Sequence, residues 1–136
     1  MEARLTAVTL GVADVPRAVA FYGALGLTPK MQMEDVAFLP LNGAVLCLYR
    51  DLALDAGVEM EGRKPGLCAI AHNVRERLDV DTVLEDARAA GAAITREAHD
   101  ADWGGRSGYF ADPDGHLWEV AWNPGWPLDE AGRVHL

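Results

Sequence analysis

Apolar and polar positions alternate along short stretches of this chain, and one such stretch is followed by a segment with helical spacing. Residues 5–12 carry bulky side chains at every second position, which predicts a β-strand with one bulky and one small face. Apolar residues then recur with helical spacing over 15–25. Asp14 is the predicted N-cap of this helix, and Gly26 is its predicted end.

The same order of elements recurs in the second half, which indicates an internal repeat of strand, helix and three strands, or βαβββ. The predicted strands are 5–12, 28–34, 36–39, 44–49, 67–72 and 92–97, together with the two arms of a hairpin within 108–122. The second helix is striped by Val80, Leu84 and Ala87, with Asp79 or Asp81 as its predicted N-cap and Gly91 as its end.

These elements predict one domain over residues 1–136. Its parts are a first module at 4–50, a connector at 51–66, a second module at 67–123 and an irregular tail at 124–136. The connector has little apolar periodicity and several glycine, proline and charged residues, so we expect a loop there.

Glu119 lies within the apolar returning strand of the 108–122 hairpin, whose predicted turn is Asp112-Pro113-Asp114-Gly115. A carboxylate at such a position needs a partner, a metal or a wet cavity, because burying it alone costs too much. A solvated strand face is the alternative. We expect any function visible in the sequence to lie near Glu119.

Composition excludes several classes of protein. The formal net charge is −9 at pH 7, which argues against a nucleic-acid partner, since phosphate binding needs a basic face. No apolar run reaches the ~18 residues of a membrane span, and the first residues lack a signal-peptide pattern. We therefore expect a cytoplasmic protein with no membrane partner. Cys47 and Cys68 lie in apolar runs without C-x-x-C spacing, and both are predicted as buried thiols.

Several motifs occur in order: Gly11-Val12-Ala13-Asp14, Phe21-Tyr22, Leu25-Gly26-Leu27, Phe110, Asp112-Pro113-Asp114-Gly115 and Trp118-Glu119-Val120. Together they resemble the vicinal oxygen chelate superfamily, which includes glyoxalase I, extradiol dioxygenases, fosfomycin-resistance enzymes and bleomycin-resistance proteins. The resemblance covers nearly the whole chain apart from the connector and the tail. It implies an α+β fold in which two βαβββ modules, each a curled mixed sheet with its helix outside, enclose a cavity.

In such a fold, alternation along the strands divides the side chains between two faces of each sheet. The bulkier set is expected to pack under the helices: Val8, Leu10, Val12, Leu46, Leu48, Ile70, His72, Trp118, Val120 and Trp122. The other set includes many small side chains, which would leave room for a ligand. The predicted ligand pocket comprises Ala7, Thr9, Val45, Cys47, Tyr49, Leu67, Ala69, Ala71, Leu117, Glu119 and Ala121, with Trp103 from a glycine-rich loop.

Metal-dependent members of the superfamily take His, Gln or Glu ligands from the first and last strands of each module. The matching positions here are Ala7, Cys47, Leu67 and Glu119. Ala7 and Leu67 have no donor atoms, and Cys47 would ligate only a soft metal as a thiolate. Glu119 with water does not make a tight divalent site. The prediction is therefore no metal and no cofactor.

The resemblance leaves three functions open. The first, which we favour, is a metal-free binding protein similar to the bleomycin-resistance branch, and thus linked to antibiotic resistance. In it Trp103, Trp126 and Tyr49 suit an aromatic or cationic small-molecule ligand. The second is an enzyme, either metal-free with Glu119 as general acid or base or, if the ligand positions are misaligned, a metal-dependent lyase or dioxygenase. The third is an interaction module with Glu119 in a buried salt bridge, for example to Arg106.

Pairing of single chains is common in this superfamily, with sites formed between subunits. We therefore expect a homodimer with two equivalent cavities. An intact monomer stays possible, because each chain holds two modules.

Overall fold

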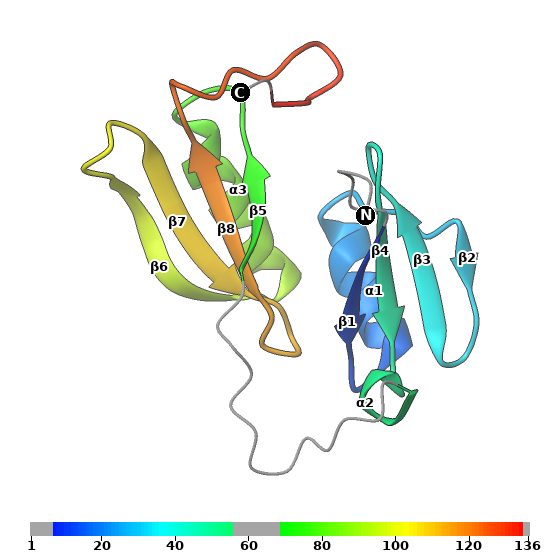
Figure 1. Ribbon diagram of the computed structural model, residues 1–136. Helices are drawn as coiled ribbons and strands as arrows, with labels where there is room; N and C mark the ends of the chain where they lie inside the picture. The colour runs from blue at the N-terminus through cyan, green and yellow to red at the C-terminus, as the bar shows by residue number, and fades with distance from the viewer. Residues whose placement is uncertain (1–6, 56–68, 135–136) are drawn as a thin grey trace. The chain divides into compact units, whose positions relative to one another are not determined.

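The computed structural model describes residues 7–55 and 69–134 (Figure 1). The chain divides into two units, Met1–Leu67 and Cys68–Leu136, and each carries one mixed four-stranded sheet with a helix on one face. Each unit follows the predicted order βαβββ, so the α+β fold class is confirmed. No helix within the described ranges is long and apolar enough to cross a membrane.

The first unit contains β1 (Ala7–Gly11), α1 (Val15–Ala24), β2 (Met31–Gln32), β3 (Val36–Pro40), β4 (Val45–Tyr49) and the short α2 (Leu52–Asp55). Its strand order is β1-β4-β3-β2, with β1 parallel to β4 and the other pairs antiparallel. Asp14 is the N-cap of α1, as predicted, because its side chain accepts a 2.7 Å hydrogen bond from the Arg17 backbone N–H. Gly26, just beyond the helix, has φ +88°, a backbone conformation that favours glycine.

The core of the first unit lies between α1 and the sheet, where α1 packs against β3 and β4. Its largest fully buried side chains are Val15, Tyr22, Leu39, Leu46 and Leu48. The buried residues recur at every second position on β4 and at helical spacing on α1. Alternation therefore predicted correctly which residues of β4 face the helix.

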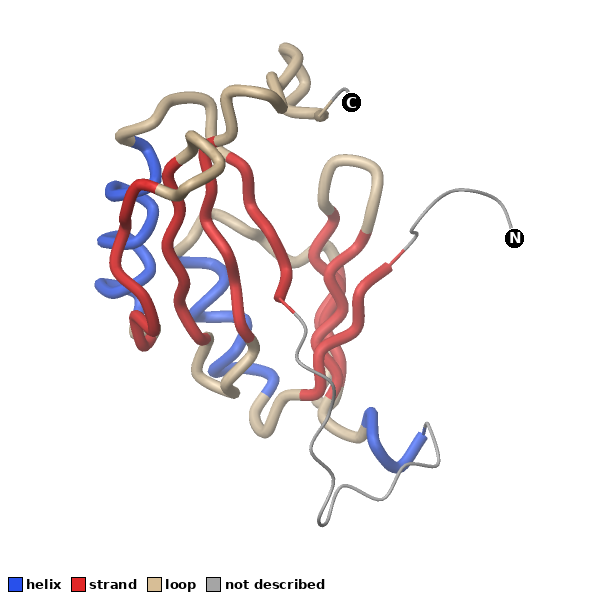
Figure 2. Tube along the Cα trace, turned by 60° about the vertical axis from the view of Figure 1, so that its left-hand side comes forward, coloured by secondary structure: helices blue, strands red, loops and turns tan. Residues whose placement is uncertain are grey.

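The second unit contains β5 (Ala69–Asn73), α3 (Asp79–Ala90), β6 (Ala93–Asp100), β7 (Arg106–Ala111) and β8 (Leu117–Trp122). Its order is β5-β8-β7-β6, with β5 parallel to β8 (Figures 1 and 2). The predicted turn joins β7 to β8, and Asp112 organises it by accepting hydrogen bonds from the backbone N–H groups of Asp114 and His116 at 3.0 and 2.8 Å.

The core of the second unit lies between α3 and the strands β6, β7 and β8. Leu84 of α3 is 2% exposed and faces Gly108 of β7. Phe110 and Trp118 stack in parallel on the same side of the sheet, with ring centroids 6.1 Å apart. The helix therefore covers the face that carries Trp118 and Val120, as alternation predicted.

Several predicted boundaries were wrong. The strand predicted at 28–34 is only Met31–Gln32, the strand predicted at 92–97 continues to Asp100, and α2 occupies the start of the predicted loop. Leu78, not Asp79 or Asp81, is the N-cap of α3, and it makes no side-chain capping bond. Tertiary contacts override local propensity at these boundaries. The short helix α2, for example, packs against β1.

Four side chains expected under a helix are not buried, and two of them, Val8 and Ile70, are half-buried on the edge strands β1 and β5. His72 is exposed and Trp122 is half-buried, although the register places both on the helix side of their sheet. His72 is exposed because β5 is an edge strand, and α3 packs over the other three strands of the sheet. Cys47 is buried as predicted, whereas Cys68 lies outside the described residues.

An ion-pair cluster ties α3 to the sheet. The Arg106 guanidinium donates from Nε and Nη2 to the two carboxylate oxygens of Asp81, at 2.7 and 2.6 Å, and from Nη1 to Asp100 at 3.0 Å. These hydrogen bonds lower the pKa of Asp81 and of Asp100. A carboxylate with a lowered folded-state pKa stabilises the fold above its ordinary pKa, and this contribution is lost as the pH falls through the lowered value.

Asp81→Asn is therefore expected to reduce the thermal stability of the protein at neutral pH more than in acid. The measurement is the unfolding midpoint of wild type and variant between about pH 7 and about pH 3, where the difference should shrink as the wild-type carboxylate is protonated. An equal difference at both ends of this range would mean that the Asp81 charge does not support the fold.

Candidate functional site

Glu119 lies at the centre of β8 and faces away from α3. The register pairs it with Tyr109 of β7 on one side and Ala71 of β5 on the other. The Tyr109 hydroxyl donates a 2.9 Å hydrogen bond to Oε1 of Glu119, and both residues are half-buried. Oε2 of Glu119 makes no hydrogen bond within the part of the chain that the structure describes. The pair thus offers a ligand one acceptor oxygen of a carboxylate.

The Tyr109 hydroxyl keeps its proton at neutral pH. Its hydrogen bond to Glu119 raises the pKa of Tyr109, and burial raises it further, while Arg96 acts in the opposite direction. Tyr109 therefore remains a donor and Glu119 its acceptor.

Most side chains beside this pair on the same face of the sheet are apolar, while Arg96 of β6 pairs with Tyr109. The register places Ala71, Leu117, Ala121 and Ala111 there, with Ser107 paired with Ala121. A polar pair within a small, mostly apolar surface is the usual composition of a small-molecule site. Of the residues predicted to line the pocket, Ala69, Leu117, Glu119 and Ala121 share this face, while Leu67 lies outside the described residues.

The first unit brings the other predicted residues together on the face of its sheet opposite α1. Ala7, Thr9, Val45, Cys47 and Tyr49 share that face by register. Cys47 is 7% exposed, and burial raises the pKa of its thiol in spite of a hydrogen bond with Thr9. Desolvation, followed by the nearby carboxylates, raises the pKa of Tyr49. Both groups are therefore protonated at neutral pH.

The two tryptophans considered as stacking surfaces lie elsewhere in the second unit. Trp103 is in the β6–β7 connection, where its ring occupies the space that a Cβ on Gly105 would need, at 1.7 Å. Trp103 is 52% exposed. Trp126 is exposed in the tail and lines a cavity of about 450 Å³ together with Trp122 and Pro124.

Known proteins resemble this chain in both sequence and structure. A model of the glyoxalase/bleomycin resistance protein/dioxygenase superfamily matches residues 4–120. The chain belongs to this superfamily. A glyoxalase-related enzyme from Fulvimarina pelagi has a similar structure, with 39% identity over 98% of each chain and a TM-score of 0.90.

More distant structures share the superfamily fold. A glyoxalase/bleomycin resistance protein/dioxygenase from Nocardioides is 26% identical, covering 100% of this chain and 91% of its own, with a TM-score of 0.73. Lactoylglutathione lyase from Agrobacterium tumefaciens is 20% identical, covering 89% of this chain and 94% of its own, with a TM-score of 0.68. At that identity the likeness shows the fold alone.

The alternative name of the superfamily, vicinal oxygen chelate, refers to a bound metal, and a metal needs several donor side chains. Ala7 has no donor, the raised pKa of Cys47 disfavours the thiolate, and Glu119 already accepts from Tyr109. Within the described residues, no three His, Cys, Asp or Glu side chains are grouped as metal ligands. The residues at these positions therefore do not fit the superfamily's metal site.

The sequence indicated Glu119 as a candidate but not its partner Tyr109. The predicted four-residue turn over 112–115 would pair Tyr109 with Trp118, whereas the structure pairs Asp112 with His116, and this one-residue shift brings Tyr109 opposite Glu119. The alternative of a Glu119–Arg106 salt bridge was wrong. Arg106 pairs with Trp122 on the helix side of the sheet, where it binds Asp81 and Asp100.

Proposed function

We propose that this protein is a small-molecule-binding member of its superfamily that holds an aromatic or cationic ligand against the β5, β7 and β8 face of its second unit, without a bound metal. The observation that carries the proposal is the Glu119 carboxylate, which has one oxygen held by Tyr109 and the other oxygen without a hydrogen bond among the described residues. Its neighbours across β5, Ala69 and Ala71, are small and apolar.

The charge of this carboxylate favours a cationic ligand. A hydrogen bond from a charged N–H group to a half-buried carboxylate contributes about 1.5–3 kcal/mol. The net charge of −9 adds a weaker attraction for cations at a distance. The Tyr109 ring, on the same face, is a surface against which a planar ligand could stack at an additional ~0.5–1.5 kcal/mol.

Glu119→Gln is expected to weaken binding of proflavine, a planar aromatic cation, by about tenfold, because the amide keeps a hydrogen-bond acceptor but loses the charge. Ligand fluorescence measures the affinity. Asp86→Asn is the matched control, since it removes one negative charge from the exposed face of α3. Equal affinity for wild type and Glu119→Gln, or no binding of proflavine to wild type, would contradict the proposed site.

The metal-free part of the proposal has its own measurement. Calorimetric titration of metal-stripped protein with nickel, zinc, manganese and ferrous ions is expected to show no stoichiometric uptake, because Ala7 and Glu119 do not complete a donor set. Uptake of one ion per chain would overturn this part.

A second candidate function is acid–base catalysis by the same pair. The hydrogen bond between Tyr109 and Glu119 favours it, since a carboxylate base beside a protonated phenol can remove a proton next to a carbonyl and donate to the oxygen. The structure from Fulvimarina pelagi is described as a glyoxalase-related enzyme, which also supports this candidate. Deuterium incorporation into dihydroxyacetone in heavy water, followed by NMR, would reveal the activity, and Glu119→Gln should abolish it.

The homodimer remains a prediction. Among the described strands, β1 and β2 are the edges of the first sheet and β5 and β6 are the edges of the second, so each sheet has two edges without a partner strand. Edges of this kind are common places for strand pairing or cover by another element. Sedimentation velocity measures whether the chain is a dimer at micromolar concentration.

A further inference from the structure

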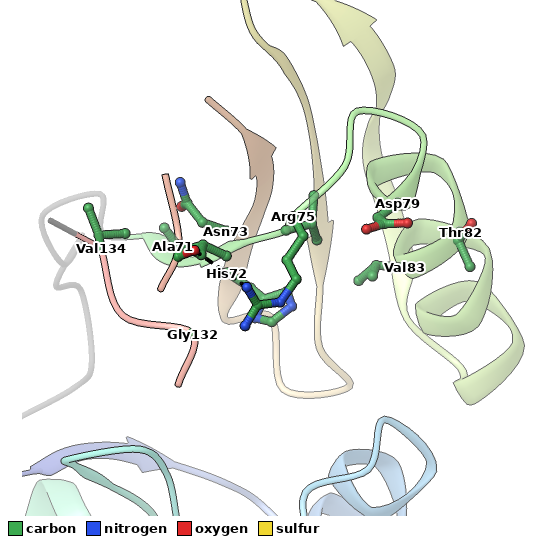
Figure 3. Close-up of a pocket in the computed structure, with 11 residues that line it drawn as sticks. Ala71, His72, Asn73, Arg75, Asp79, Thr82, Val83, Gly132 and Val134 are labelled. Carbon is green, nitrogen blue, oxygen red and sulfur yellow. Dashed lines mark hydrogen bonds between the residues drawn. The ribbon is translucent and has the colours of Figure 1, made fainter. Parts of the chain in front are cut away.

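A cavity of about 610 Å³ lies in the second unit beside β5, and Ala71, the register partner of Glu119, is one of its lining residues (Figure 3). It is bounded by the end of β5, the first turns of α3 and the tail that follows β8. Its volume is within the ~300–1,000 Å³ typical of sites for small molecules. Neither Glu119 nor Tyr109 lines it.

Arg75 supplies a positive charge to this cavity. Its guanidinium donates to the backbone carbonyls of Leu128 and Glu130, at 3.4 and 3.2 Å, and thereby holds the tail beside β5. Arg75 forms no ion pair with a carboxylate among the described residues. Backbone carbonyls carry no full charge, so the guanidinium retains its attraction for an anion.

Asp79 supplies a negative charge from the opposite wall. Its Oδ2 accepts a 3.1 Å hydrogen bond from the backbone N–H of Glu76, and its Oδ1 makes no hydrogen bond with a described residue. Figure 3 shows Asp79 at the start of α3 and Arg75 on the β5 side of the same cavity. The two charges lie more than 4.0 Å apart, since they form no salt bridge.

The remaining walls are mostly uncharged. Val83 of α3 and Leu128 and Val134 of the tail contribute apolar surface. His72 also lines the cavity, and desolvation lowers its pKa, so at neutral pH its ring adds no second positive charge. One cation, one anion and an apolar wall thus converge on a single space.

We propose that this cavity binds a free α-amino acid with a branched apolar side chain. The guanidinium of Arg75 holds the α-carboxylate, the Oδ1 atom of Asp79 accepts from the α-ammonium, and the side chain lies against Val83, Leu128 and Val134. A zwitterion pairs with both charges at once. A simple acid leaves Asp79 without a partner charge, and a simple amine leaves Arg75 without one.

Three probes of matched shape test the proposal by calorimetry on the full chain: L-leucine, isocaproate, which lacks the ammonium group, and isoamylamine, which lacks the carboxylate. L-leucine is expected to bind at least about tenfold more tightly than either analogue, because each analogue loses a charge-assisted hydrogen bond. Equal affinity for the three, or no heat from L-leucine at millimolar concentration, would overturn it.

Two variants connect binding to the cavity. Asp79→Asn keeps an acceptor for the Glu76 N–H but removes the charge, so L-leucine should bind about tenfold more weakly while isocaproate should not weaken. Val83→Phe should block all three probes by filling the space. Asp102→Asn, which removes an exposed carboxylate in the β6–β7 connection, is the control and should change nothing. Unchanged L-leucine affinity in both cavity variants would place its binding elsewhere.

Proflavine binding separates this site from the Glu119 site. Asp79→Asn is expected to leave proflavine affinity unchanged, and Glu119→Gln is expected to leave L-leucine affinity unchanged. Either proposal can therefore fail without the other. Loss of both ligands in a single variant would show that the two faces act as one site and would overturn the separate cavity.

Discussion

Shortening Leu84 to alanine is expected to lower the free energy of unfolding by about 2–5 kcal/mol, the usual range for a leucine whose removal leaves a cavity in a core. Leu84 is 2% exposed and lies between α3 and the sheet of the second unit. Only α3 covers this face of β6, β7 and β8 within the described ranges, so neighbouring side chains have little freedom to fill the gap. Urea denaturation followed by tryptophan fluorescence measures the change.

The control for Leu84→Ala is the same substitution at the start of the same helix. Leu78 is 69% exposed, so Leu78→Ala should change the free energy of unfolding by less than about 0.5 kcal/mol. Similar losses at the two positions would mean that the intrinsic stability of α3, and not its packing on the sheet, determines the effect.

Adding one methyl group to Gly108 is expected to lower the free energy of unfolding by about 1–3 kcal/mol. A Cβ at this position would lie 2.5 Å from Cδ1 of Leu84, 3.0 Å from the carbonyl oxygen of Arg96 and 3.1 Å from the backbone nitrogen of Ala98. The leucine can rotate away, but the two β6 backbone atoms cannot move without straining the sheet. Thermal and urea unfolding of Gly108→Ala measure the cost.

Gly23→Ala is the control for Gly108→Ala and should act in the opposite direction. Gly23 lies in α1, where a Cβ would meet nothing within 4 Å, so alanine should stabilise the helix by about 0.8–1 kcal/mol. The double variant Leu84→Ala/Gly108→Ala should lose less stability than the two single losses combined, because truncation removes one of the collisions. Full additivity would contradict the contact between Leu84 and Gly108.

Alternation and turn chemistry predicted most of this fold because both are local. The Asp14 cap needs only the residues that follow it, and the turn residues at 112–115 predict that β7 pairs with β8. Once that pairing is set, every second residue on β8 is assigned to a face, which is why Trp118 and Glu119 were placed on opposite sides correctly.

The parts that escaped prediction depend on contacts between residues far apart in the chain. Asp81 was considered as a helix cap, yet its carboxylate is bound by Arg106, which lies 25 residues later. Arg75 holds carbonyls 53 and 55 residues away, so no local pattern reveals the cavity beside it. Tyr109 escaped because the loop between β7 and β8 is one residue longer than the predicted turn, and a shift of one residue decides which side chain lies opposite Glu119.

The strand orders also determine when each sheet can be completed during synthesis. β4 lies between β1 and β3, and β8 lies between β5 and β7, so the strand made last in each unit belongs in the interior of its sheet. On a ribosome the first unit has all its strands once Tyr49 has emerged, whereas β5 has no partner until Leu117–Trp122 is made. A nascent chain halted between these points would carry a finished first sheet and an unpaired β5, and that interval is when a chaperone would be most needed.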